Sequence, residues 1–232
     1  IMGQFNGIPL EKPLTRVRET AELVKIMLAG EKTDYDGETV FSRGYRQAPM
    51  ENAPQVYLAA LRPKMIEMAA EVGDGVIFNL WPKAALPKMM EHVAIGAKAA
   101  GKDPAGVEIV NRAMVLCTDD KEYGRNLFRA AFGPYYATPV YNNFLAWAGY
   151  TEAAAQIAEG WAEKDRNKTA SAMSDEMIDE IAIIGNEDEI QARIQADADG
   201  GVDTHIIAPL AAKKEDVDRT FAAFTGTAFQ FA

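Results

Sequence analysis

Residues 55–80, QVYLAALRPKMIEMAAEVGDGVIFNL, decide the fold because they hold two apolar runs on either side of a helical pattern. The first run, residues 55–61, is short and rich in strand-forming residues, which indicates a buried strand. A helical pattern follows to Val72, a glycine-rich turn comes next, and the second run covers residues 76–80. A strand, a helix and a strand in so short a stretch form a compact βαβ unit, which predicts parallel strands with a right-handed crossover.

The same alternation continues on both sides of this unit. Before it, apolar residues spaced three and four apart predict an amphipathic helix over residues 14–28 that Gly30 ends, and residues 31–54 are predicted to be a polar connection. After it we expect a helix over 83–100, a strand over 107–117, a strand over 204–210 and a last helix near 214–224. Four strands that alternate with helices indicate an α/β fold.

One crossover is much longer than the others. Between Thr118 and Gly201 the sequence shows helical patterns at residues 121–132, 140–148, 151–164, 174–182 and 187–198. We interpret residues 119–184 as a helical insertion within a single domain that spans residues 1–232. An excursion of this length either forms a wall over a substrate or widens the layer of helices, and we favour the wall.

The composition excludes several classes of protein. The formal net charge of −10 argues against a nucleic-acid partner, because binding to phosphates needs clustered Lys and Arg. A single cysteine, Cys117, permits neither an internal disulfide nor a cysteine-based zinc cluster, and we expect no metal. No apolar run reaches the roughly 18 residues of a membrane span, so we expect no membrane partner and a cytoplasmic location. Because the chain starts with Ile1 instead of Met, we expect a trimmed terminus or a fragment.

The nearest match to a named motif does not support the usual function of that motif. Residues 96–103, GAKAAGKD, resemble a phosphate-binding loop, but Asp103 replaces the hydroxyl that binds magnesium and the segment ends a helix. The two histidines, His92 and His205, are predicted to be structural. We expect Cys117, which ends an apolar strand, to be a buried small hydrophobic residue.

Three other features are better candidates for a site. The turn after the first strand places Arg62 and Lys64 beside the free N–H groups of a new helix, where α/β folds bind phosphates, although two solvated surface cations are the alternative. After the second strand, Asn79 and Trp81 supply an amide for a flat heterocycle and an aromatic wall. The third feature is residues 132–144, FGPYYATPVYNNF, whose aromatic residues either pack the helices together or line a pocket for an organic substrate.

Three longer segments together resemble a known family. They are FNGIPLEKPLTRVRETAELVKIMLAGE (5–31), PQVYLAALRPKMIEMAAEVGDGVIFNL (54–80) and IIGNEDEIQARIQADADGGVDTHII (183–207). They are similar to the luciferase-like monooxygenase superfamily, and most similar to its branch that uses the deazaflavin coenzyme F420. The resemblance covers nearly the whole chain, and the YLAAL-x-PKM turn with the GDG strand entry is its most specific part.

The resemblance implies a (β/α)₈ barrel of the bacterial-luciferase type that binds coenzyme F420, or alternatively FMN, at the carboxyl ends of its strands. It implies that the phosphate-bearing tail of the cofactor lies beside Ala59, Ala60, Leu61, Arg62, Lys64 and Met65, with Asn79 on the rim of the next strand. It implies that the substrate lies near Tyr135, Tyr136, Tyr141 and Asn142. Relatives often have Gly where this chain has Arg62, so the backbone path there, or the tail that it accepts, can differ.

A full barrel has eight strands, and only four are visible here. The resemblance therefore implies an N-terminally truncated or partial barrel with a helical insertion before the last strand. We expect a homo-oligomer, such as a homodimer, or a partner that supplies the missing half. The leading functional hypothesis is an oxidoreductase that transfers a hydride between coenzyme F420 and a small organic substrate. An FMN-dependent monooxygenase and a non-catalytic fragment that acts as an assembly partner are the alternatives.

Overall fold

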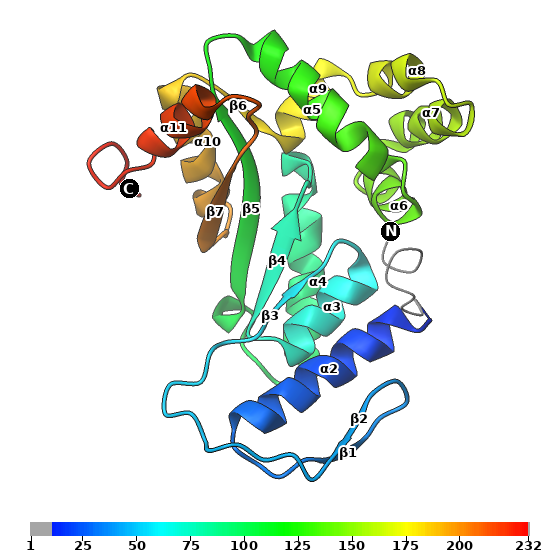
Figure 1. The fold of residues 1–232 in the computed structure, drawn as a ribbon, viewed down its shortest axis with the longest axis vertical. Coiled ribbons are helices and arrows are strands. Elements are labelled where there is room, and N and C mark those ends of the chain that lie inside the picture. The colour runs from blue at the N-terminus through cyan, green and yellow to red at the C-terminus, as the bar shows by residue number, and fades with distance from the viewer. Residues whose placement is uncertain (1–10, 232) are drawn as a thin grey trace. The chain divides into compact units, whose positions relative to one another are not determined.

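A computed structural model describes residues 11–231 and divides into two compact units (Figure 1). The first comprises residues up to Val76 together with His92–Val107, and the second comprises Ile77–Glu91 together with Glu108–Ala232. The two glycines and two prolines of residues 3–13 also predict an irregular lead-in, most of which lies outside the described residues. No helix in the described range combines the length and the apolar character that crossing a bilayer requires. The prediction of one domain over the whole chain stays a prediction.

The first unit is built on one long amphipathic helix, which confirms the sequence prediction. Helix α2 (Pro13–Leu28) ends before Gly30, whose φ of +72° is a left-handed conformation that glycine adopts without strain. Arg18 of α2 donates two hydrogen bonds to Glu71 of helix α3 (Pro63–Val72), so the two helices are joined by a bidentate ion pair. The other elements of this unit are β1 (Asp34–Asp36), β2 (Phe41–Arg43), β3 (Tyr57–Ala59), η2 (Pro104–Gly106), the start of β4 (Gly75–Asn79) and the end of α4 (Leu86–Ala99).

A hairpin stands where the sequence predicted a polar connection at residues 31–54. Strands β1 and β2 pair antiparallel, and the buried carboxylate of Glu19 on α2 holds the turn between them. Glu19 accepts hydrogen bonds of 2.6–3.1 Å from the Thr39 hydroxyl and from the backbone N–H groups of residues 38–40. These hydrogen bonds, first that of the Thr39 hydroxyl, lower the pKa of Glu19 to about 2. The hairpin was missed because its strands are short and polar, and its anchor lies on a helix upstream.

The segment 96–103, which resembles a phosphate loop, has a structural explanation at three positions. A Cβ atom at Gly96 would lie 1.9 Å from a backbone carbonyl oxygen of α3, so glycine permits the close approach of α4 to α3. Gly101 has a φ of +69° and follows the end of α4. The Nζ atom of Lys102 donates to two carbonyl groups at the end of α3, 2.7 and 3.2 Å away. Gly96 and Lys102 therefore fasten α4 to α3, and Gly101 follows the end of α4.

The second unit centres on strand β5 (Glu108–Cys117). Strands β6 (Ile183–Gly185) and β7 (Thr204–Pro209) both pair with β5 in parallel. Val115 pairs with a residue of each, so β6 and β7 lie on opposite edges of β5, and β4 is a further neighbour in the sheet. These parallel strands, joined by helices, confirm the predicted α/β fold (Figure 1). The three-residue strand β6 was not predicted.

Alternate residues of β5 point to two different faces of the sheet. The odd-numbered residues of 113–117 pack with helix α10 (Glu187–Asp199) and helix α11 (Lys214–Ala222), and Cys117 is buried among them as predicted. The even-numbered residues 114 and 116 belong to a second core, which the long crossover covers. Arg112 lies on the same face as residues 114 and 116, and its side chain is exposed.

Five helices form the long crossover. They are α5 (Lys121–Tyr136), α6 (Pro139–Trp147), α7 (Thr151–Ala162), α8 (Arg166–Ser171) and α9 (Asp175–Ile181). Four match predicted patterns, but α5 continues through Pro134, and the short α8 was not predicted. Phe128, Tyr136 and Phe144 are completely buried, so part of the aromatic segment packs the helices together.

Candidate functional site

The first group of predicted site residues lies in the turn after β3, in the first unit. β3 ends at Ala59, Ala60 is buried, and Leu61 and Met65 are half-buried. Arg62 has an extended backbone and an exposed side chain, directly before the proline that begins α3. The guanidinium of Arg62 is therefore carried on a backbone that the half-buried side chains of Leu61 and Met65 hold in place.

The start of α3 offers fewer free N–H groups than the sequence predicted. Pro63 has no N–H group, and the N–H groups of residues 65 and 66 both donate to the carbonyl of Arg62 at 2.9 Å. In the described part of the chain, the N–H of Lys64 is the donor of this first turn that keeps no partner. An anion at this turn would therefore depend mainly on side chains.

The two cations of this turn differ in their partners. The ammonium of Lys64 lies 2.7 Å from Glu67, whose other oxygen lies 2.9 Å from Nδ1 of His92. The hydrogen bond from Lys64, and next that from His92, lower the pKa of Glu67. The guanidinium of Arg62, whose carbonyl accepts the two N–H groups named above, has no hydrogen bond or ion pair with residues 11–231. Glu67 thus offsets the charge of Lys64, while no carboxylate among the described residues offsets the charge of Arg62.

The second group begins at the bend after β4, in the second unit. Leu80 is buried and has a φ of +53°, an uncommon conformation for a residue other than glycine. Its carbonyl accepts a hydrogen bond of 2.9 Å from the hydroxyl of Tyr136. The buried indole of Trp81 donates to Oδ1 of Asn111 at 3.0 Å. These two hydrogen bonds fix the bend and thereby the position of Asn79 at the strand end.

Asn79 belongs to a polar cluster on the sheet face opposite α10 and α11. Its Nδ2 donates to the hydroxyl of Tyr141 at 3.3 Å, and its Oδ1 accepts from Arg112 at 3.4 Å. Arg112 also contacts the sulfur of Met114 at 3.2 Å and has no carboxylate partner in residues 11–231. It pairs across β5 and β7 with Ile206, which is 46% exposed. An exposed cation beside an exposed aliphatic side chain makes this face suitable for a ligand with a flat polar ring.

The four residues predicted to lie near a substrate have two kinds of surroundings. Tyr135 is 47% exposed, and its ring lies edge-on to that of Tyr141 with 6.0 Å between centroids. Tyr136 is fully buried, and burial raises its pKa well above the ordinary value. The Asn142 amide donates to the carbonyls of Tyr136 and Ala154, at 3.1 and 2.7 Å. Tyr135 and Tyr141 are therefore available to a ligand, while Tyr136 and Asn142 hold the helices in place.

Comparison with known protein families shows to which family the chain belongs. A sequence model of the luciferase-like monooxygenases matches residues 1–204, which is most of the chain. The chain belongs to the luciferase-like monooxygenase family. The resemblance found in the sequence is thus confirmed.

Within this family, the chain is similar to archaeal reductases. It is 32% identical to the 5,10-methylenetetrahydromethanopterin reductase of Methanolobus tindarius, over 90% of this chain and 65% of the relative. It is 29% identical to the reductase of the same name from Archaeoglobus fulgidus, over 87% of this chain and 62% of the relative. The chain thus spans less than two thirds of the length of these relatives.

Two solved structures share the fold of this chain. The coenzyme F420-dependent tetrahydromethanopterin reductase of Methanopyrus kandleri matches with a TM-score of 0.75 and 21% identity, over 94% of this chain and 64% of that protein. An F420-dependent secondary alcohol dehydrogenase, in complex with an F420–acetone adduct, matches with a TM-score of 0.73 and 12% identity, over 98% of this chain and 66% of that protein. At these identities the likeness establishes the fold of this family member and leaves its ligand to be argued from its own residues.

Arg112 is the candidate residue of this family member that the sequence reading missed. Its signal was available, because a lone arginine interrupts the apolar strand predicted for residues 107–117. Alternation places it on the face of Met114, and Asn79 approaches from the neighbouring strand. The predicted residues themselves divide between the units: 59–65 lie in the first, and Asn79 with the tyrosine cluster lies in the second. Their roles in binding stay predictions.

Proposed function

We propose that this chain is part of an oxidoreductase that transfers a hydride between coenzyme F420 and a small organic substrate. The observation that carries the proposal is the hydrogen-bonded cluster of Asn79 and Arg112 on the sheet with Tyr141 on α6. Family membership and the similarity to archaeal methylenetetrahydromethanopterin reductases support it.

The side chains present suit such a coenzyme. The Asn79 amide and the Arg112 guanidinium are hydrogen-bonded to each other, and their remaining N–H groups can donate to acceptors of a flat heterocycle. Arg62, with no acid beside it in the described residues, suits the anionic tail of a coenzyme. When bound, the coenzyme supplies the hydride chemistry.

In this proposal the residues of the chain bind and orient the coenzyme and its substrate. Asn79 is held by the buried bend at Leu80, so its amide is oriented before a ligand arrives. Tyr135 and Tyr141 present ring edges and faces against which a small organic substrate can pack. We also propose that the working form is a homo-oligomer, or a complex with a second polypeptide that covers the exposed sheet face at Ile206.

A fluorescence titration tests the proposal. Coenzyme F420 at fixed concentration is mixed with increasing amounts of the purified chain, and quenching of the coenzyme fluorescence reports binding. We expect saturation below about 100 µM, within the usual range of enzyme–ligand affinities. Arg112→Gln should weaken binding about tenfold, because it removes a charged donor. Arg46→Gln is the matched control, since Arg46 is exposed and has no partner in residues 11–231.

The outcomes separate the alternatives. Absence of quenching, from protein that circular dichroism shows to be folded, would refute the proposal for this chain. Binding of FMN in place of F420 would indicate a monooxygenase, and binding of neither would favour an assembly partner. Where F420 binds, its absorbance in the presence of methylenetetrahydromethanopterin or a secondary alcohol tests the substrate class. Sedimentation velocity tests the oligomeric state.

A further inference from the structure

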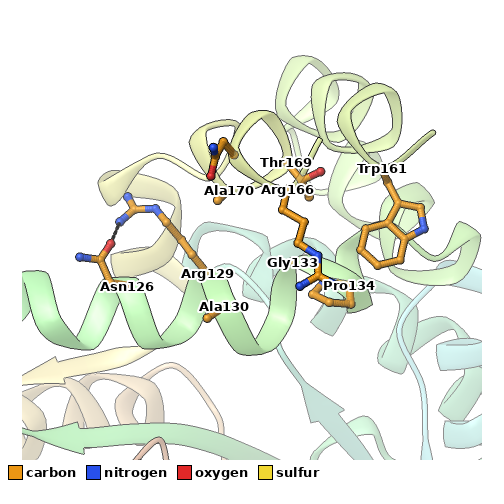
Figure 2. A pocket seen from close by; sticks show the side chains of 10 residues that line it. Asn126, Arg129, Ala130, Gly133, Pro134, Trp161, Arg166, Thr169 and Ala170 are labelled. Atoms are coloured by element: carbon orange, nitrogen blue, oxygen red, sulfur yellow. Dashed lines mark hydrogen bonds between the residues drawn. The ribbon is translucent and has the colours of Figure 1, made fainter. Parts of the chain in front are cut away.

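A hollow of about 460 Å³ lies between helices α5, α7 and α8 of the second unit (Figure 2). None of the residues assigned to the proposed coenzyme site lines it. Its floor is formed by small and apolar residues of α5, and its rim carries two arginines, two asparagines and a tryptophan. The lining residues are Asn126, Arg129, Ala130, Gly133, Pro134, Trp161, Arg166, Asn167, Thr169 and Ala170. This volume falls in the usual range for small-molecule sites.

The walls of the hollow are held firmly. A Cβ atom at Gly160 of α7 would lie 2.7 Å from the backbone nitrogen of Thr169 on α8, so the two helices are in close contact. Lys164, with a φ of +59°, makes the sharp turn between them, and Asp165 caps α8 by accepting from the N–H of Lys168 at 2.9 Å. The hollow is therefore a feature of packed helices and does not depend on a loose loop.

The two arginines of the rim have opposite surroundings. Arg129 donates to the carbonyl of Met173 at 3.0 Å and to Asn126 at 3.1 Å, and it forms an ion pair with Asp175. Its charge is compensated. The guanidinium of Arg166, by contrast, has no hydrogen bond or ion pair among the described residues.

The nearby carboxylates do not pair with Arg166. Glu159 and Glu163 both pair with Lys168 at 3.0 Å, and Asp165 is used as the helix cap. Figure 2 shows Arg166 extending from α8 toward Gly133 and Pro134 on α5, into the hollow. A guanidinium is a planar, permanently charged donor that suits a carboxylate. The hollow thus holds one uncompensated positive charge in a chain whose net charge is −10.

An aromatic side chain stands beside this charge. Trp161 is 47% exposed, and Figure 2 shows its indole on the same side of the hollow as Arg166. Pro134 lies opposite on α5 and, having no N–H group, cannot donate to the carbonyl of Ala130 in the floor. An exposed indole and a guanidinium without a partner in the described residues therefore line one hollow.

We propose that this hollow binds a small planar aromatic or heteroaromatic molecule that carries a carboxylate. The ring stacks on Trp161, and the carboxylate accepts hydrogen bonds from Arg166. The amide of Asn167, which has no hydrogen bond in the described range, provides a further donor at the rim. The proposal does not rest on the proposed function, because none of the residues that line the hollow is assigned to the coenzyme or to its substrate.

Indole-3-acetate and indole-3-acetamide are a suitable pair of probes, since they share a ring and differ in charge. The chain contains three tryptophans, so the indole N–H signal of Trp161 in a ¹⁵N-labelled sample can be assigned by its loss in Trp161→Phe. We expect indole-3-acetate to shift this signal in a saturable way at concentrations up to about 10 mM. The acetamide should bind at least about tenfold more weakly, because it lacks the charge that Arg166 recognises.

Two variants complete the test. Arg166→Gln should weaken indole-3-acetate about tenfold and abolish the preference over the acetamide, while the exposed control Arg46→Gln should change neither. Trp161→Leu should also weaken binding, measured by calorimetry. The proposal is overturned if the Trp161 signal does not shift, if the acid and the amide bind equally, or if Arg166→Gln binds like the parent chain. All variants replace exposed side chains, and a thermal melt by circular dichroism confirms that each is folded.

Discussion

The turns after β3 and β4 occupy equivalent places in the chain, each leading from a strand to a helix, but their surroundings are opposite. After β3, Arg62 and Lys64 are exposed. After β4, Leu80 and Trp81 are only 2% and 3% exposed. The buried turn is held by hydrogen bonds to core side chains, whereas the exposed turn leaves one guanidinium without a partner in residues 11–231. The first turn therefore offers the uncompensated positive charge of Arg62 to a ligand, whereas the second turn holds the backbone at the end of β4 in a fixed conformation.

The hairpin turn at residues 38–40 shows what a satisfied turn looks like. Its backbone N–H groups donate to an anion that the chain itself supplies, the buried carboxylate of Glu19. No carboxylate in the described residues does this for Arg62. An exposed donor group that the fold leaves unfilled is therefore the place where an external anion is expected, and substitutions there should change binding more than stability.

The largest expected effect is on the buried turn. Trp81→Ala removes a buried indole and leaves Oδ1 of Asn111 without its donor, so the free energy of unfolding should fall by about 3–5 kcal/mol. Urea denaturation followed by circular dichroism measures this. Trp161→Ala, at a half-exposed tryptophan, is the control and should cost much less. Similar losses from both variants would break the contrast between buried and exposed positions.

A smaller loss is expected from Tyr136→Phe. This change keeps the ring in the core but removes the hydroxyl that donates to the carbonyl of Leu80, which leaves a buried acceptor unpaired at a cost of about 1–3 kcal/mol. Tyr45→Phe, at an exposed tyrosine, serves as the matched control. If the bend positions Asn79 as proposed, the affinity for coenzyme F420 should fall together with stability. Unchanged affinity would show that the bend is structural only.

The hairpin provides a test by pH. The pKa of Glu19 falls from 4.5 to about 2 in the folded chain, so the ionised carboxylate stabilises the hairpin fully above about pH 4.5. This stabilisation is lost as the pH falls from 4.5 toward 2. Amide hydrogen exchange at residues 38–40 should therefore lose protection over this interval, after correction for the intrinsic pH dependence of exchange. In Glu19→Gln the protection should be low at every pH, and a pH profile like that of the parent would contradict the role of Glu19.

Much of the architecture could be predicted because it depends on long apolar patterns. The strand at 107–117 and the helices that flank 55–80 were found since burial on one or both faces leaves a periodic signal in the sequence. The β1–β2 hairpin and α8 left no such signal, because they are short and are held by side chains such as Glu19 and Asp165. Helix α5 passes through Pro134 because packing of its aromatic residues outweighs the lost hydrogen bond.

The candidate site was less predictable than the fold. The positions of Asn79 and Arg62 follow from strand ends, which a sequence reveals. The sequence does not reveal whether a cation has a carboxylate partner. Lys64 pairs with Glu67 one helical turn later, whereas Glu159 and Glu163 pair with Lys168 and not with Arg166. Partner choice among charges of similar spacing depends on side-chain geometry, which only the folded chain fixes.

The smallest expected effect distinguishes the two cations of the exposed turn. Arg62→Ala should weaken coenzyme F420 about tenfold, while Lys64→Ala should weaken it about threefold or less, because Glu67 already offsets the charge of Lys64. Neither should change the melting temperature appreciably, since both side chains are exposed. In a Glu67→Gln background, Lys64 loses its carboxylate partner, and Lys64→Ala should then cost as much affinity as Arg62→Ala. A larger loss of affinity from Lys64→Ala in the parent chain would mean that the ion pair with Glu67 opens when the coenzyme binds. The contrast between the paired and the unpaired cation would then be wrong.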